Sequence, residues 1–167
     1  MDSLEFTVER IDQSSNVIIC NLFEYYLHDM AEWFRFDTGD DGHYHYDMAP
    51  HWQRGDEVYL LRCAGKLAGF ALVTSAKPWL NGADGYDVEE FFVVRRYRHT
   101  GAGDALARAI WAMHPGEWLV RVYEGNVPAI PFWRKIISRY ANDRQIEERR
   151  IVNGKAWSFF HFKSGAE

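Results

Sequence analysis

The sequence predicts a single domain of the α/β class. Three observations lead to this prediction: strand-like and helix-like segments alternate along the chain, no repeat or linker divides its 167 residues, and the apolar content is 47 %. The expected order of elements is β-α-loop-β-β-β-α-β-α-β-β. Because a chain of this length can bury one hydrophobic core without disulfide bonds, we expect one domain over residues 1–167.

The chain begins with a strand and a long helix. Residues Phe6–Ile11 alternate enough between apolar and polar types to predict a strand. Ser14 or Ser15 can cap the helix that follows, which we expect to continue to Phe34. The apolar residues of this helix that recur at helical spacing, and that we expect to face a sheet, are Val17, Ile18, Leu22, Tyr25, Tyr26 and Leu27.

Residues 35–55 differ in composition from the segments around them. Aspartates, glycines and Pro50 are interleaved there with histidines and aromatic residues. This composition predicts a long loop with at most a short helical piece. Loops of this length in compact domains are usually functional or mobile, so we expect the segment to contribute to function.

The second half of the chain continues the alternation of strands and helices. Ala64-Gly65 and Asn153-Gly154 both indicate hairpin turns, and Asn153-Gly154 is the stronger signal. The expected strands are Glu57–Cys63, Lys66–Ser75, Val88–Val94, Trp118–Tyr123, Glu147–Val152 and Lys155–Phe162, and the expected helices are Ala102–Met113 and Pro128–Tyr140.

The turn Arg98-His99-Thr100-Gly101-Ala102-Gly103 joins an expected strand to an expected helix. The first N–H groups of a helix have no partner within it, and the helix dipole adds positive charge there, so phosphates bind such places readily. Glycines at 101 and 103 let a diphosphate approach the backbone, and Arg98 adds a cation. Neither G-x-x-x-x-G-K-[ST] nor a complete G-x-G-x-x-G occurs, which indicates a diphosphate carrier other than a nucleoside triphosphate or a dinucleotide.

Two blocks of the sequence resemble the GNAT superfamily of N-acetyltransferases. Val93–Gly103, followed by Leu106, resembles its acetyl-CoA motif, whose core is [Q/R]-x-x-G-x-[G/A]. Asn126–Lys135 resembles its N-x-x-A-x-x-[aliphatic/aromatic]-Y-x-K segment and follows after one short strand, as in the family. The resemblance implies a mixed, mainly antiparallel sheet of six to seven strands with helices on both faces. It also implies acetyl-CoA as the co-substrate.

The resemblance also assigns residues to the cofactor. In the family, the strand before the glycine turn pairs through its backbone with the pantetheine arm, and the turn binds the diphosphate. The cofactor-binding residues implied for this chain are Phe91, Phe92, Val93, Arg98, His99, Thr100, Gly101, Ala102, Gly103, Asp104 and Asn126.

An amine must lose its proton before it can attack a thioester. In the family a carboxylate on the strand before the turn often accepts it, and the candidates here are Glu89 first, then Asp87 and Glu90. Strand alternation places Asp87 and Glu89 on one face and Glu90 on the other, although a bulge in the strand would exchange the faces beyond it.

The chain departs from the family at the general acid, because Trp133 stands where many members of the family have a tyrosine. An indole N–H is a donor and not a useful acid. Tyr123, Tyr140 or solvent could protonate the leaving thiolate, and Tyr123 is the candidate catalytic residue among them.

The loop between Asp37 and Trp52 lies where GNAT proteins usually form the acceptor pocket. Its carboxylates and rings suit a cationic amine, and the candidate substrate-binding residues are Asp37, Tyr44, Tyr46 and Trp52. The histidines His43, His45 and His51 raise the alternative of a metal site. We expect no metal, because no cysteine lies nearby in the sequence and no H-E-x-x-H motif occurs.

The charge and composition of the whole chain indicate where the protein is located and which partners it does not bind. A net charge of -5 argues against binding to nucleic acid or to an anionic membrane. Only Cys20 and Cys63 are present, no stretch of about 18 apolar residues occurs, and the N-terminus lacks the apolar segment of a signal peptide, so we expect a cytoplasmic protein.

These observations favour an N-acetyltransferase that transfers an acetyl group from acetyl-CoA to a primary amine of a small, cationic acceptor. A protein or peptide N-acetyltransferase and a non-catalytic acyl-CoA-binding module with this fold are the alternatives. Dimers are common in the family, and the surplus of aromatic residues is compatible with a homodimer.

Overall fold

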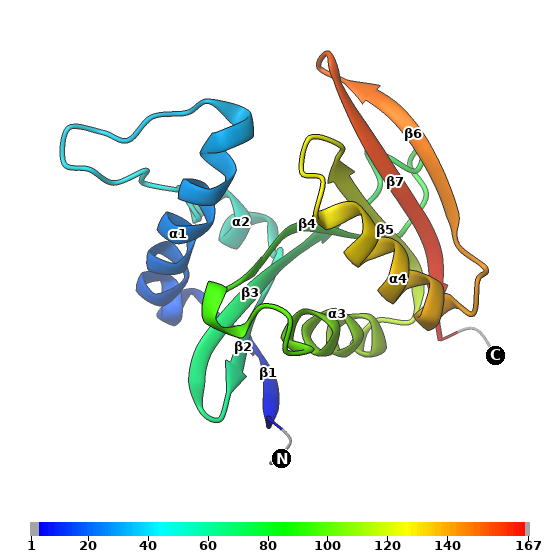
Figure 1. Cartoon of the computed structure of the whole chain (residues 1–167), viewed down its shortest axis with the longest axis horizontal. Helices are drawn as coiled ribbons and strands as arrows, with labels where there is room; N and C mark the ends of the chain where they lie inside the picture. Colours follow the sequence, from blue (N-terminus) through cyan, green and yellow to red (C-terminus); the bar gives the residue numbers. More distant parts are fainter. Residues whose placement is uncertain (1–3, 166–167) are drawn as a thin grey trace. The chain divides into compact units, whose positions relative to one another are not determined.

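A computed structural model describes residues 4–165 of the chain (Figure 1). Its elements confirm the predicted α/β class and the predicted order, with one short helix added inside the long loop. The strands are β1 (Phe6–Ile11), β2 (Glu57–Cys63), β3 (Lys66–Ser75), β4 (Tyr86–Val93), β5 (Gly116–Tyr123), β6 (Ile146–Val152) and β7 (Lys155–Ser164). The α-helices are α1 (Asn16–Phe34), α2 (Ala49–Arg54), α3 (Ala102–Met113) and α4 (Ala129–Ala141), and the short 3-10 helices are η1 (Gln13–Ser15) and η2 (Arg95–Tyr97).

The described strands form a mixed sheet of seven strands in the order β1-β2-β3-β4-β5-β7-β6. The pairs β1–β2, β5–β7 and β6–β7 are antiparallel, whereas β4 and β5 are parallel. The chain divides into two compact units, one made of residues up to 72 together with 90–106, and the other of residues 73–89 together with 107 onward. A single domain over residues 1–167 therefore stays a prediction.

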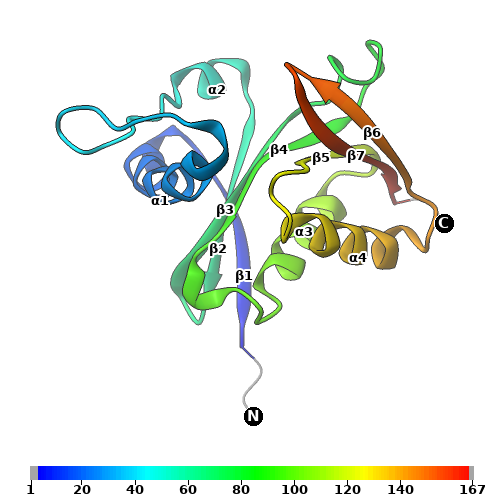
Figure 2. The same cartoon turned by 45° about the horizontal axis from the view of Figure 1, so that its top comes forward.

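The first unit is built around the packing of α1. Its hydrophobic core contains Ile19, Leu22 and Phe23 of α1, together with apolar residues of β2, β3 and β4. In this unit β1 pairs with β2 from Phe6 opposite Cys63 to Ile11 opposite Val58. The segment between α1 and α2 leaves the end of α1 as an extended loop and returns to α2 (Figures 1 and 2).

The buried face of α1 differs from the face that the sequence predicted. Val17 and Tyr25 were expected to be buried but are 71 % and 65 % exposed. Ile19 and Phe23, which the predicted stripe omitted, are completely buried. The capping prediction also changes, because Ser15 makes no side-chain cap and Asp12 caps η1 by accepting a hydrogen bond from the Ser14 N–H at 2.9 Å.

The second unit contains β5, β7 and β6. β5 pairs with β7 from Gly116 opposite Ser164 to Tyr123 opposite Trp157. The Asn153-Gly154 turn joins β6 to β7 and sets Val152 opposite Lys155, as the sequence predicted. In this unit α4 packs against β7 (Figure 1).

The segment from β4 to α3 carries most of the predicted site. The parallel ladder between β4 and β5 joins Tyr86–Val88 to Trp118–Val120. β4 then continues to Val93 and leads through η2 and a short turn into α3. The candidate base residues, the predicted pantetheine strand and the predicted phosphate turn therefore follow one another along a single stretch of chain.

Candidate active site

The turn before α3 has positive backbone φ angles at two positions, and Gly103 lies within the helix. His99 and Gly101 both have positive φ, of 62° and 91°, and α3 begins at Ala102. The Ala105 N–H donates to the Gly101 carbonyl at 2.9 Å, so the amides of Ala102 and Gly103 come before the first helical hydrogen bond. These amides lie at the positive end of the helix dipole.

The space beside Gly101 tests whether acetyl-CoA fits this turn. A Cβ atom built on Gly101 would meet no atom within 4 Å, so its backbone faces open space. A side chain there would both fill that space and adopt a strained positive φ. The turn thus fits a diphosphate that is held by backbone N–H groups.

The Arg98 side chain is fixed within the first unit. Its Nη2 donates to Asp29 Oδ2 of α1 at 2.7 Å, and its Nε donates to the Val93 carbonyl at 2.8 Å. Burial raises the pKa of Asp29, but hydrogen bonds from Arg98 and then Arg95 outweigh it and hold the pKa below its ordinary value. Arg98 therefore ties the turn to α1, and its positive charge is shared with Asp29.

The three candidate carboxylates have different surroundings. Asp87 is fully buried, and Arg121 donates two hydrogen bonds to its Oδ2. Glu89 is half-buried two residues further along β4 and is close enough to act electrostatically on Asp87. Glu90 is half-buried and accepts a hydrogen bond from the Tyr26 hydroxyl of α1.

Tyr26 belongs to a group of rings in mutual contact, which we call the aromatic cluster: Phe23, Tyr26, Tyr46, Phe70 and Phe92. The Tyr46 ring stacks on Phe23 with a centroid distance of 3.9 Å and an interplanar angle of 5°. Tyr26 packs edge-on against Phe23, with their centroids 5.9 Å apart. A carboxylate held by a ring of this cluster is suited to a cation, because aromatic faces attract positive charge.

The long loop is attached to α1 by one carboxylate. Glu24 accepts the Tyr44 N–H at 2.7 Å and the His45 N–H at 2.9 Å. The Tyr44 ring also packs edge-on against Phe36 at a centroid distance of 5.7 Å. Glu24 therefore holds the loop to α1 at Tyr44 and His45, although its place in the middle of α1 gave no sign of this in the sequence.

The four predicted substrate-binding residues are in different environments. Asp37 is exposed, while Tyr44, Tyr46 and Trp52 are half-buried. The Trp52 indole N–H donates to Asn16 Oδ1 at 2.8 Å, which binds α2 to the start of α1. Of the four residues, Tyr46 is the one whose ring belongs to the aromatic cluster.

The predicted acid candidates lie in the second unit. The Tyr123 ring contacts two residues: Lys155, whose Nζ is 5.1 Å from the ring centre, and Trp157, whose ring centre is 5.6 Å away. The Tyr140 hydroxyl bonds to Ser164 at 2.7 Å, and its ring packs on Trp111. Trp133 is 6 % exposed and packs near Trp111, so it is a core residue of α4.

The histidines of the loop do not gather into a metal site among residues 4–165, where no group of three or more metal-ligating side chains occurs. His45 bonds to Asp41 at 2.6 Å, and His51 lies between Tyr46 and Asp56. Asp56 was not predicted to take part in a site, although its position just after Gly55 is a turn signal.

Over the described residues 4–165, no helix is long and apolar enough to cross a membrane.

The sequence matches the Acetyltransferase (GNAT) family over residues 27–137, which is more than half of the chain. The chain belongs to the GNAT acetyltransferase family. It is accordingly an acyltransferase that depends on acetyl-CoA, and the matched region contains β4, the glycine turn and α3.

Solved structures have the same fold as this GNAT chain. A GNAT-family acetyltransferase from Streptococcus agalactiae has a TM-score of 0.71 at 13 % identity, covering 97 % of this chain and 96 % of that one. YncA, a putative acetyltransferase from Salmonella typhimurium with its cofactor acetyl-CoA, has a TM-score of 0.63 at 12 % identity, covering 95 % and 93 %. Naa50 from Arabidopsis thaliana, in complex with a bisubstrate analogue, has a TM-score of 0.60 at 14 % identity, covering 93 % and 97 %. None of the curated proteins matches the sequence.

Proposed function

We propose that this GNAT acetyltransferase acetylates a primary amine of a small, cationic acceptor, and that Glu90 takes up the proton of the amine. The observation that carries the proposal is the hydrogen bond from Tyr26 to Glu90, which holds a half-buried carboxylate against the aromatic cluster. An ammonium group gains both from a carboxylate and from aromatic faces. A neutral or anionic acceptor gains from neither.

Glu90 replaces Glu89 as the first candidate base for two reasons. Glu90 belongs to the same unit as α1 and residues 37–52, which we call the acceptor loop, and Tyr26 of α1 donates to it. Phe92, two residues further along β4, belongs to the core against α1, so strand alternation places Glu90 on that same face. Asp87, in contrast, is fully buried and bonded to Arg121, which suits a structural role.

The cofactor assignment continues from the turn before α3. When bound, acetyl-CoA supplies an activated thioester. The amides of Ala102, Gly103 and Asp104 would hold its diphosphate, and the backbone of Phe91–Val93 would bind its pantetheine arm. Asn126 and Tyr123 retain their proposed roles as cofactor contact and general acid.

A thiol-release assay tests the acceptor class. The purified protein is supplied with acetyl-CoA and, separately, with spermidine, kanamycin or a pentapeptide with a free N-terminal amine. We expect release of CoA thiol with spermidine or kanamycin, because both are small polycations. Release with the pentapeptide alone would contradict the proposal and favour a peptide acetyltransferase.

We also propose a cytoplasmic location. Cys20 and Cys63 are both free thiols, which suits a reducing compartment. Fractionation of cells that produce the protein at its natural level tests this, and recovery in the membrane or secreted fraction would contradict it.

A further inference from the structure

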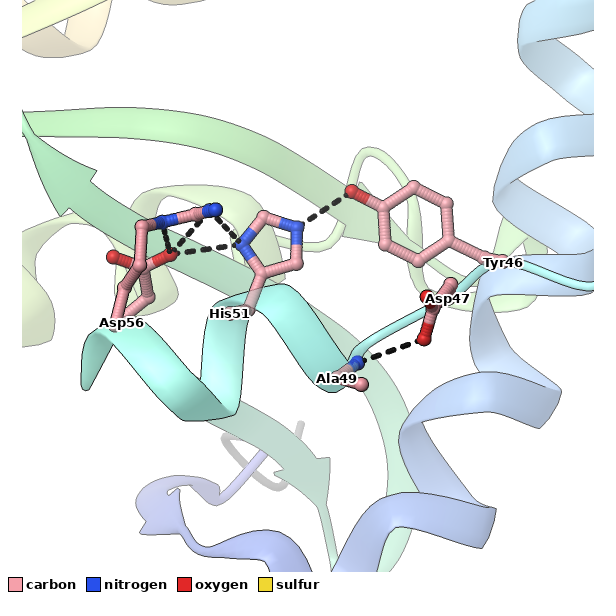
Figure 3. Close-up of polar contacts among 6 residues, drawn as sticks. Tyr46, Asp47, Ala49, His51 and Asp56 are labelled. Carbon is pink, nitrogen blue, oxygen red and sulfur yellow. Dashed lines mark hydrogen bonds and ion pairs between the residues drawn. The ribbon is translucent and has the colours of Figure 1, made fainter.

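A chain of three polar side chains joins the acceptor loop to the end of α2 (Figure 3). The Tyr46 hydroxyl lies 2.8 Å from His51 Nε2, and His51 Nδ1 lies 2.9 Å from Asp56 Oδ2. His51 is 6 % exposed, and the Asp56 side chain is 9 % exposed. The His51 and Asp56 side chains are thus removed from water and need polar partners, because burying them unpaired is costly.

The local sequence brings these groups together. α2 ends at Arg54, and the capping residue Gly55, with a φ of 75°, turns the chain back on the helix. The Asp56 N–H then donates to the His51 carbonyl at 3.0 Å, and this returns the Asp56 carboxylate to the His51 ring. Arg54 donates to the same Oδ2 atom of Asp56 from Nη2 at 2.7 Å and from Nε at 3.1 Å.

The direction of the hydrogen bonds follows from Asp56. An ionised carboxylate only accepts hydrogen bonds, so the short contact with His51 requires a proton on Nδ1. In a neutral imidazole Nε2 is then an acceptor, and the Tyr46 hydroxyl must donate to it. Arg54 Nη2 is also 2.9 Å from Nδ1, and one of its two hydrogens is used by Asp56 Oδ2. The 2.9 Å contact between Nδ1 and Oδ2 favours the proton on Nδ1, because two acceptors would repel each other at that distance. Tyr46, Arg54 and Asp56 are the titratable residues in polar contact with His51 among residues 4–165.

We propose that His51 and Asp56 are positioning residues that make the Tyr46 oxygen a hydrogen-bond acceptor for the amine substrate. With its proton committed to Nε2, the phenol oxygen offers lone pairs, and an amine is rich in N–H donors. Stacking on Phe23 holds the Tyr46 ring in the aromatic cluster whose Tyr26 donates to Glu90. In this proposal the amine would have two acceptors, the Tyr46 oxygen and the Glu90 carboxylate. This inference rests on the proposed function.

The tautomer of His51 can be measured without any acceptor. Nitrogen-15 NMR of the histidine rings, assigned with the His51→Gln variant, distinguishes a protonated Nδ1 from a protonated Nε2. The inference requires that Nδ1 carries the proton in the wild-type protein. It also requires that this preference is lost in Asp56→Ala, which has no side-chain acceptor for Nδ1. A proton on Nε2 in the wild-type protein would overturn the inference, because Tyr46 would then accept from His51.

A matched pair of substitutions tests the effect on the acceptor. The amide of glutamine at position 51 reaches the place of Nε2 and can still accept from Tyr46, whereas that of asparagine reaches only the place of Nδ1. We expect Tyr46→Phe and His51→Asn to raise the KM for the amine about tenfold, the effect of losing one oriented hydrogen bond. His51→Gln should stay much closer to wild type, and the KM for acetyl-CoA should not change. Tyr25→Phe, which alters an exposed tyrosine of α1, is the control.

The outcomes separate this inference from the proposed function. Acetyl transfer with an unchanged amine KM in Tyr46→Phe and His51→Asn would overturn the inference and leave the proposed function standing. Equal losses in His51→Asn and His51→Gln, together with a fall in melting temperature, would also overturn it, because they indicate a purely structural network. Failure to acetylate any small amine would contradict the proposed function, and the tautomer measurement would still decide the direction of the hydrogen bonds.

Discussion

Arg121 donates two hydrogen bonds to one oxygen of Asp87, from Nε at 2.9 Å and from Nη2 at 2.6 Å. The other oxygen, Oδ1, is buried and has no hydrogen-bond partner within residues 4–165. The Trp79 ring covers the guanidinium, with its centre 4.4 Å from Arg121 Cζ. Burial raises the pKa of Asp87 to about 6, and the pairing with Arg121 reduces this effect without cancelling it.

This buried carboxyl group makes stability depend on pH. Between about pH 4 and 6 the folded protein keeps a proton on Asp87 that the unfolded chain releases, so the free energy of unfolding falls as the pH rises through this range. The loss is at most about 3 kcal/mol and is complete above pH 6. Urea unfolding of the wild type and of Asp87→Asn from pH 4 to 8 measures it. The same pH dependence in both proteins would contradict the assignment.

Substitution of Glu90 by glutamine removes the proposed base and retains its shape. We expect kcat at neutral pH to fall at least about a hundredfold, the usual contribution of a general base, with an unchanged dissociation constant for acetyl-CoA. Glu89→Gln on the same strand is the matched comparison and should lower kcat much less. If Glu89→Gln lost more activity than Glu90→Gln across the pH range, the order of the two bases would be reversed.

Gly69 of β3 allows the backbone of Phe92 to approach closely. A Cβ atom at position 69 would lie 2.2 Å from the Phe92 carbonyl oxygen, which is far inside contact distance. Gly69→Ala should therefore lower the free energy of unfolding by about 2 kcal/mol or more, because backbone must move. Gly42→Ala, where a Cβ atom would meet nothing within 4 Å, should cost only about 1 kcal/mol from its positive φ. Thermal unfolding of the two variants compares them, and equal costs would refute the close approach.

Glu24 is expected to control the acceptor loop without affecting the cofactor. Glu24→Ala removes the acceptor of the Tyr44 and His45 amides. We expect faster proteolysis within residues 36–47 and a KM for the amine raised several-fold, with unchanged binding of acetyl-CoA. A replacement of the loop by a short Gly-Ser link should abolish use of the acceptor altogether. Survival of acceptor use after that replacement would remove the loop from the substrate site.

Local signals in the sequence predicted the elements well, but not the contacts between them. The Asn153-Gly154 hairpin and the glycine turn before α3 are local, because their conformations depend on residues adjacent in the chain. The prediction of the buried face of α1 was wrong because apolar residues recur on two overlapping stripes of the helix. Helical spacing alone does not choose between these stripes. Ile19 was therefore missed although it is completely buried.

The sequence also did not predict the contacts that the site residues make with one another. Tyr26 and Glu90 are 64 residues apart, so no sequence pattern linked them. The contact of His51 with Asp56 spans five residues, but it depends on the turn at Gly55. Asp87 was a candidate because of its type and position, and only its burial against Arg121 revealed its different environment.

Binding of acetyl-CoA at the start of α3 is the step on which the proposed function depends most. Amide NMR of the protein during titration with acetyl-CoA tests this directly, with Gly101→Val as the matched variant. We predict large shift changes at the amides of residues 99–104 in the wild type and none in the variant at the same concentrations. Saturable binding that leaves these amides unchanged, or that Gly101→Val does not weaken, would contradict the account.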